Sequence, residues 1–402
     1  MQVKLSQILS SLESGGRPKG GASLDNKGIP SLGAEHLDSN GGFNFKSVKY
    51  IPEDYFNGLK NGIIEKENIL IVKDGATTGK VSYVTEDFPF EKASVNEHVF
   101  LLKIDKSKAY PRFAFHYLKC PQGQRDIMRD FRGATVGGIS RGFVDFVKFE
   151  LPPLPDQLHI ANLLSKAENL IAQRKESIRL LDEFLKSTFL EMFGDPIANK
   201  KKWKSLQVSD YGESRLGKML DGKKIIGNNL KPYLRNSNVL WFEFKLDELL
   251  EMDFDEKDRV EFSLKNGDIL MCEGGEIGRC AIWRDELNEC YFQKAIHRIR
   301  LNKNIVLPEY FVYMFWLYTI NGGLNKYMGA ATISHLTGEK LKKMKLPISP
   351  IELQTQFTQI VEKTEALKAQ YQQSLQELEN MYGSLSQKAF RGELGVKQLA
   401  KA

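Results

Sequence analysis

The feature that most constrains the fold of this chain is an internal duplication. The segment ENILIVKDGATTGKVSYV (residues 67–84) aligns with GDILMCEGGEIGRCAIW (residues 267–283). LPPLPDQLHI (residues 151–160) likewise aligns with LPISPIELQTQF (residues 346–357). The offset stays near 200 residues, half of the 402-residue chain. A repeat of this size indicates one structural unit present twice.

Each copy has two parts. The first is a mixed domain, in which short strands such as NILIV and HVFLLKI accompany a helix predicted over YPRFAFHYLKCPQGQRDIMRDF, residues 110–131. The second part is a long helix that opens after a proline-rich entry. The predicted organisation is α+β, with these boundaries: a mixed domain at 1–150, a helix at 151–197, a second mixed domain at 198–345, a second helix at 346–395, and a tail at 396–402.

Both long helices carry an apolar seam with alternating spacings of four and three residues. Such a heptad seam is typical of helices that supercoil on a partner, and the equal length and matching register of the two favour antiparallel pairing with each other. The alternative is that each amphipathic helix packs separately on its own domain. The residues predicted to pair are Ile160, Leu164, Ile171, Arg174, Ile178, Leu181 and Leu185 in the first helix, and Phe357, Val361, Tyr371, Leu375, Leu378 and Tyr382 in the second.

The glycine-rich stretch KDGATTGKV (residues 73–81) superficially suggests a nucleotide-binding loop. A phosphate-binding P-loop needs four residues between its glycines and a Ser or Thr after the lysine. Here three residues separate Gly75 from Gly79, and the second copy, GGEIGR, places Glu276 where a phosphate would lie. The pattern therefore predicts a repeated hairpin whose turn uses the positive φ angles open to glycine. Lys80 and Arg279 supply a basic residue in both copies.

Composition and motif searches exclude several classes of protein. No apolar run is long enough for a membrane-spanning helix, and no secretory signal is present, so a cytoplasmic protein with no membrane partner is expected. The four cysteines form no Cys-x-x-Cys pair, which argues against a metal site. We find no motif of a methyltransferase, metal-dependent nuclease, serine hydrolase or zinc protease. No catalytic residue and no cofactor is assigned to this chain; the net charge of +6 permits a nucleic-acid partner.

The duplicated order resembles the specificity subunit of type I restriction-modification systems over nearly the whole chain. The resemblance is carried by two variable domains, each with an Ile-Leu strand and glycine turn, and each followed by LPP…DQ…I or LP…LQ…F leading into a heptad helix. EMFGD (Glu191–Asp195) and QKAFRGEL (Gln387–Leu394) also fit the helix ends of that family.

The resemblance implies a non-catalytic subunit that recognises double-stranded DNA. Each mixed domain, as a target-recognition domain, would read one half of a bipartite site, and the coiled coil would set the distance between half-sites. Two methyltransferase subunits would dock on the helical regions, and a nuclease and translocase subunit would join them. S-adenosylmethionine, ATP and magnesium would belong to those partners.

Residues that contact DNA are sought among basic and amide side chains, which bind phosphates and read base edges. Arg125, Arg129 and Arg132, at spacings of four and three residues, would share one helical face; the alternative is that they form a solvated helix face. The candidates are Arg17, Lys19, Lys73, Thr77, Lys80, Arg125, Arg129, Arg132 and Arg141 in the first domain, and Lys218, Lys223, Lys224, Arg235, Asn236, Arg279, Lys326, Tyr327 and His335 in the second.

Three other interpretations stay open at this point. A coiled-coil scaffold whose mixed domains bind proteins would show no sequence preference for DNA. A stand-alone nuclease would cleave DNA with magnesium as the isolated chain. A specificity subunit of a methylation-only system would differ only in lacking the nuclease partner.

Overall fold

The computed structural model describes residues 2–133, 137–219, 227, 229–327 and 335–394. The chain forms two compact units, each of which is described by itself. The first unit comprises residues 1–175 and 374–402, and the second comprises residues 176–373. Each of the two long helices therefore contributes to both units.

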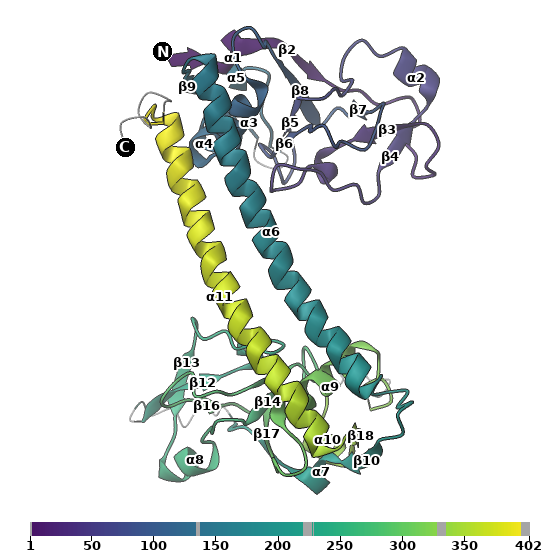
Figure 1. Ribbon diagram of the computed structural model, residues 1–402, viewed down its shortest axis with the longest axis vertical. Coiled ribbons are helices and arrows are strands. Elements are labelled where there is room, and N and C mark those ends of the chain that lie inside the picture. Colours follow the sequence, from purple (N-terminus) through teal and green to yellow (C-terminus); the bar gives the residue numbers. More distant parts are fainter. Residues whose placement is uncertain (1, 134–136, 220–226, 228, 328–334, 395–402) are drawn as a thin grey trace. The chain divides into compact units, whose positions relative to one another are not determined.

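The first unit contains three small sheets (Figure 1). The four-stranded sheet has the order β2 (Leu9–Ser14), β8 (Val99–Ile104), β5 (Ile69–Val72), β6 (Val81–Tyr83). The three-stranded sheet has the order β4 (Lys49–Ile51), β3 (Ile29–Leu32), β7 (Ser94–Val95), and β1 (Gln2–Lys4) pairs with β9 (Lys148–Glu150). All pairs are antiparallel except β3 with β7. The short helices are α1 (Leu5–Ile8), η1 (Ala34–His36), α2 (Glu53–Asn57), α3 (Pro111–Lys119), α4 (Pro121–Met128) and α5 (Phe143–Phe146).

The second unit repeats these sheets strand for strand. Its four-stranded sheet has the order β11 (Gly212–Leu216), β17 (Ile296–Leu301), β14 (Ile269–Cys272), β15 (Cys280–Ile282). Its three-stranded sheet has the order β13 (Leu250–Asp253), β12 (Leu230–Leu234), β16 (Tyr291–Phe292), and β10 (Lys204–Gln207) pairs with β18 (Lys345–Ile348). The short helices are α7 (Val208–Tyr211), η3 (Asn236–Asn238), α8 (Glu256–Glu261), α9 (Pro308–Ile320) and α10 (Gly338–Lys343). The duplication inferred from the sequence is confirmed.

The central strands β5 and β14 are apolar at every position because they are covered on both faces. In β5, Ile69 and Ile71 belong to the core that includes the helices, whereas Leu70 and Val72 belong to a second core over the three-stranded sheet. Successive side chains of a strand point to opposite faces. Each unit thus has two cores on either side of one sheet, and β14 divides its residues between two cores in the same way.

The prediction of a single helix over residues 110–131 is wrong. The chain forms α3 and α4 instead, and Cys120 between them is extended, with φ −66° and ψ 159°. Pro121 is the cause, since a proline disfavours the helical conformation of the residue before it. Helix α4 ends at Met128, so Arg129 lies at its cap and Arg132 lies beyond it. The arginines therefore do not share one helical face.

The long helices α6 (Leu154–Phe193) and α11 (Ile351–Phe390) each span 40 residues. In the first unit, Ile160 and Leu164 share a core with Ala389, and Tyr382 packs against it. In the second unit, a single core holds Leu185, Phe189, Phe193, Phe357 and Val361. In each unit the beginning of one helix meets the end of the other, as antiparallel pairing requires. The remaining seam positions are half-buried: Ile171, Arg174, Ile178, Leu181, Tyr371, Leu375 and Leu378.

A buried glutamine joins each long helix to its mixed domain. The side-chain oxygen of Gln157 accepts a hydrogen bond of 2.8 Å from the backbone N–H of Tyr110, the residue that precedes α3. Gln354 accepts one of 2.8 Å from Leu307, which precedes α9. Each glutamine also donates to a carbonyl in the turn before its own helix. This hydrogen bond gives the repeated LP…Q motif a structural role. It satisfies a backbone N–H at the start of α3 or α9 that the short helix itself leaves unpaired.

Candidate nucleic-acid interface

The glycine-rich stretches form hairpin turns in both units. The turn between β5 and β6 places Gly75 at φ +96° and Gly79 at φ +87°. The turn between β14 and β15 places Gly275 at φ +70° and Gly278 at φ +81°. Only glycine enters this region without steric cost. The predicted hairpins are confirmed.

Each hairpin turn lies beside a second loop that follows the helical segment. In the first unit, the Ile139 N–H donates to the Lys73 carbonyl at 2.8 Å, and the Gly75 N–H donates to the Gly137 carbonyl at 3.1 Å. In the second unit, the Leu336 N–H donates to the Glu273 carbonyl at 2.9 Å. We call the region formed by the hairpin turn and this loop the turn edge of each unit: residues 73–80 with 131–133 and 137–140, and residues 273–279 with 335–337. These loops come from distant parts of the chain, so only folding brings them together.

Beside the turn edge of the first unit, polar and charged side chains form a chain of contacts that reaches Lys73 and Asp74. Arg17 lies 3.0 Å from Glu97, and His98 lies 2.5 Å from Asp74, which also lies 3.8 Å from Lys73. Arg17 and His98 remain about half exposed, at 53% and 45% of their side-chain surface. The carboxylates hold these two side chains at the surface, where a phosphate could take the place of the carboxylates.

The other candidates of the first unit are spread around it. Lys19 and Thr77 are exposed. Arg129 and Arg132 pair with Asp126 and Asp130 at 3.5 and 2.9 Å. Although burial opposes it, hydrogen bonds from Ser140 and the Arg132 charge hold the pKa of Asp130 below its usual value. Arg125 donates to Gln122, and Arg141 donates to the Leu12 carbonyl. Their contact with DNA stays a prediction.

Beside the turn edge of the second unit, hydrogen-bonding side chains take the place of this chain of contacts. Asn236 donates to the Gly274 carbonyl at 2.9 Å, and His335 is exposed in the adjoining loop. Arg235, half-buried at the start of η3, donates to the Glu248 carbonyl at 3.4 Å. An amide, an imidazole and a guanidinium are groups that read base edges in a groove.

The basic residue common to both hairpins has the same structural contact in each unit. Lys80 donates to the Leu37 carbonyl at 3.1 Å, and Arg279 donates to the Asn236 carbonyl at 2.9 Å. Leu37 directly follows the short 3₁₀ helix η1, and Asn236 is the first residue of the short 3₁₀ helix η3. This contact explains why a cation recurs at the position; whether it also binds DNA stays a prediction.

The remaining candidates of the second unit are more constrained. Lys218 binds Asp258 and the Asp253 carbonyl and lies 5.0 Å from the centre of the Phe254 ring. Lys326 lies over the rings of Tyr318 and Tyr327, and a hydrogen bond with Tyr318 raises its pKa. Lys223 and Lys224 lie outside the described residues.

Reasoning from the sequence missed His98, Asp74 and Glu97. Their positions in the second copy are occupied by Ala295, Gly274 and Lys294, so the duplication drew no attention to them. The signal was VNEH, a polar cluster between two buried strands, which is typical of a loop that carries function.

Within the described ranges, His, Cys, Asp and Glu side chains nowhere gather in a group of three that could hold a metal ion. The four cysteines are buried as free thiols, and burial raises the pKa of Cys290 to about 12. None of the helices in the described part of the chain has the length and apolar character of a membrane-spanning segment.

The chain thus carries the same mixed domain and the same glycine hairpin twice. The family model for the type I restriction modification DNA specificity domain matches residues 1–180 and again residues 200–380. The chain belongs to this family, whose members are the DNA-recognition subunits of type I restriction-modification systems.

Named relatives agree with this assignment. The chain is 23% identical over 398 residues to the EcoKI specificity subunit of Escherichia coli, covering 93% of this chain and 84% of the relative. It is 24% identical over 321 residues to a putative type I restriction enzyme specificity subunit of Haemophilus influenzae, covering 78% of each.

Solved structures share the fold. A chain from a structure of the type I R-M system superposes with a TM-score of 0.60 at 17% identity, over 98% of both chains. The type I restriction-modification S subunit from M. genitalium superposes with a TM-score of 0.57 at 14% identity, over 97% of this chain and 96% of that one.

Proposed function

We propose that each unit reads one half of a bipartite site in duplex DNA, and that the paired helices α6 and α11 set the number of base pairs between the halves. The observation that carries this proposal is the duplication: the same sheets and the same hairpin occur twice, with different side chains at the two turn edges. Two readers with a common backbone and different surfaces suit a site made of two unlike halves.

The proposal assigns the chemistry to other subunits. This chain has no active site of its own; two methyltransferase subunits dock on the helical regions, and a nuclease and translocase subunit joins them. S-adenosylmethionine, ATP and magnesium are bound by those partners. The proposal is supported by the family membership.

The experiment determines the methylated motif of the host genome and then repeats the measurement with variants of each unit. The double variant Lys73→Ala and Thr77→Ala should relax one half of the motif only. Asn236→Ala with His335→Ala should relax the other half only. If either double variant degrades both halves equally, the assignment of one half-site to each unit is wrong.

A second measurement separates phosphate contacts from base contacts. If Arg125 contacts a phosphate, Arg125→Ala should weaken binding equally for all sequences and reduce the slope of log affinity against log salt by about one unit. Fluorescence anisotropy with a labelled duplex, measured across salt concentrations, reports that slope. A slope equal to that of the unmodified chain would remove Arg125 from the interface, and salt-insensitive binding with no DNA preference would instead favour a protein-binding scaffold.

A further inference from the structure

The two units differ in the side chains that lie where the mixed domain meets the long helices. In the first unit the α6 carboxylate Glu168 lies here, and its equivalent in α11 is Glu365, at the offset of 197 residues that also relates Gln157 to Gln354. Both carboxylates line a cavity, of about 540 Å³ in the first unit and about 460 Å³ in the second. The same position in the repeat therefore carries a carboxylate and a cavity twice.

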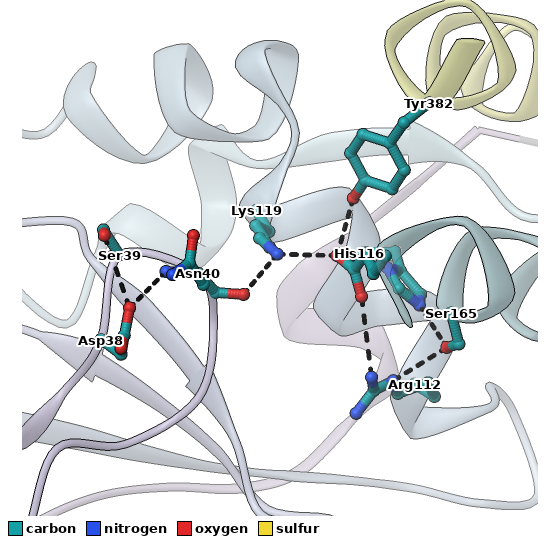
Figure 2. A network of polar contacts seen from close by, with 9 residues as sticks. Asp38, Ser39, Asn40, Arg112, His116, Lys119, Ser165 and Tyr382 are labelled. Atoms are coloured by element: carbon teal, nitrogen blue, oxygen red, sulfur yellow. Dashed lines mark hydrogen bonds and ion pairs between the residues drawn. The ribbon is translucent and has the colours of Figure 1, made fainter. Parts of the chain in front are cut away.

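In the first unit, the chain neutralises the carboxylate with its own cations. Figure 2 shows Lys119 and Arg112 from α3 and Tyr382 from α11 converging on this point. The Lys119 ammonium donates to Glu168 at 2.7 Å, the Tyr382 hydroxyl donates at 2.9 Å, and the Arg112 guanidinium lies 3.7 Å away. Although burial opposes it, the nearby His116 and the hydrogen bonds from Lys119 and Tyr382 hold the pKa of Glu168 below its usual value.

In the second unit, none of those groups recurs at the equivalent positions. The residues at the equivalent positions are Trp316 for Lys119, Glu309 for Arg112 and Leu185 for Tyr382. Glu365 is reached by the Arg284 guanidinium at 3.5 Å, but Arg284 also pairs with Glu309 at 3.2 Å. Burial raises the pKa of Glu365, which Arg284 opposes and Glu309 reinforces. This carboxylate is less well compensated than Glu168.

The cavity beside Glu365 combines negative charge with aromatic walls. Of the described residues that line it, four are aromatic, three are carboxylates and one is basic: Trp241, Phe242, Tyr313 and Trp316; Asp182, Glu243 and Glu365; and Lys368. Lys368 is already paired with Asp182. The cavity in the first unit is balanced, with three carboxylates and three cations: Asp87, Glu168 and Glu379; Arg112, Lys119 and Lys175.

Aromatic faces beside a carboxylate attract organic cations, because the ring quadrupole and the charge act in the same direction. One ring of the second cavity already shows this behaviour, since the Lys186 ammonium lies 5.8 Å from the centre of the Trp316 ring. The first unit shows what the carboxylate binds when a cation is available, namely the ammonium of Lys119.

The helices that wall this cavity also offer apolar surface to a protein. Leu180 and Phe184, four residues apart on one face of α6, each expose 49% of their surface, and Leu367 of α11 exposes 37%. Large apolar side chains grouped on one helix face are typical of a surface that another protein covers.

We propose that the cavity of the second unit binds a cationic side chain, arginine or lysine, supplied by a partner subunit. The first unit needs no such group because Lys119 occupies the equivalent place. The proposal rests on the proposed function, since partner subunits enter only with it. The proposal predicts that a partner subunit contacts the cavity beside Glu365 differently from the cavity beside Glu168, although the two units share one backbone plan.

The test assembles the full chain with its methyltransferase subunit and measures their affinity by isothermal titration calorimetry. Trp316→Lys gives the second unit the ammonium that the first already has, and should weaken assembly about tenfold or more by filling the site and removing a ring. Glu365→Gln keeps the shape and removes the charge, and should weaken assembly about threefold. Lys119→Arg, the matched control in the first unit, retains its cation and should leave the affinity unchanged.

A second measurement does not depend on assembly. Nα-acetyl-arginine amide should quench the tryptophan fluorescence of the chain, because two of its four tryptophans line the cavity, whereas the neutral citrulline analogue should not. Glu365→Gln should abolish the difference between the two probes. This variant keeps the test decisive if Trp316→Lys fails to fold, which circular dichroism would reveal.

The outcomes are distinct. Normal assembly by both variants overturns the proposal, and binding of the arginine probe without any effect on assembly does so too, since the cavity would then serve a free small cation. Failure of the proposed function would appear elsewhere, as an unmodified complex that binds no DNA site specifically.

Discussion

The two units share a backbone plan but stabilise it with different chemistry. The first unit ties its mixed domain to the long helices with a buried polar network around Glu168. The second uses aromatic packing at the same junction, where Tyr310 of α9 lies 4.8 Å from Phe193 and Tyr313 of α9 lies 5.2 Å from Phe357 between ring centres. A duplicated fold therefore needs only the same shape and the same backbone hydrogen bonds, while the side chains at the joint are free to diverge.

The largest expected effect is on the free energy of unfolding, when equivalent seam residues of the two long helices are replaced by alanine. Phe357 occupies the position in α11 that Ile160 occupies in α6, and both are almost fully buried. Phe357→Ala should lower the free energy of unfolding by about 3–5 kcal/mol, because it empties the centre of an aromatic cluster. Ile160→Ala should cost less, about 2–4 kcal/mol. Chemical denaturation gives the totals, and hydrogen exchange shows which unit is weakened.

The contrast has a direct control. Phe357→Leu restores most of the volume and should recover more than half of the loss. Equal losses for Phe357→Ala and Ile160→Ala, each confined to its own unit, would mean that the aromatic cluster adds nothing beyond ordinary apolar burial.

The next largest effect is a loss of stability of the first unit at acidic pH, caused by His116. Burial lowers the pKa of His116 from 6.5 to about 4, although the nearby Glu168 raises it. The unfolded chain therefore takes up a proton at a higher pH than the folded chain does. Stability contributed by neutral His116 is complete above pH 6.5 and falls as pH drops toward 4, by at most about 3 kcal/mol.

Urea unfolding across this pH range measures the effect, with hydrogen exchange reporting on the first unit. His116→Gln lacks the titrating ring and should flatten the dependence. His297 in the second unit is also buried and has a lowered pKa, so some pH dependence should remain there. A His116→Gln variant whose first unit loses stability as steeply as the unmodified chain would assign the effect to another group.

The smallest expected effect is the loss of stability when the buried glutamine of either unit is replaced, and it should be similar in both units. Gln157→Leu and Gln354→Leu each leave a half-buried backbone N–H, that of Tyr110 or of Leu307, without its acceptor, which costs about 1–3 kcal/mol. Gln376→Leu, on the exposed face of α11, is the control and should change stability little. Thermal unfolding compares the three. A loss at only one of the two buried glutamines would show that the joint is not a common element of the repeat.

Much of the fold could be predicted because it depends on patterns along the chain. The duplication, the heptad seam and the glycine hairpins are each written in residues close together or repeated at a fixed offset, and each is present in the structure. The error over α3 and α4 was local as well: Pro121 marks the break, but the apolar periodicity on both sides concealed it.

The candidate site was only partly predictable, because the partner of a charged side chain is decided by folding. The sequence determined that Lys80 and Arg279 recur, whereas the tertiary structure decided that both bind a carbonyl at a 3₁₀ turn. It also placed His98 against Asp74, and it surrounded Glu168 with cations while leaving Glu365 beside tryptophan. Periodicity reports which face of an element is buried, but Coulomb and hydrogen-bond energies depend on distances between segments far apart in the chain. Those distances exist only in the folded molecule.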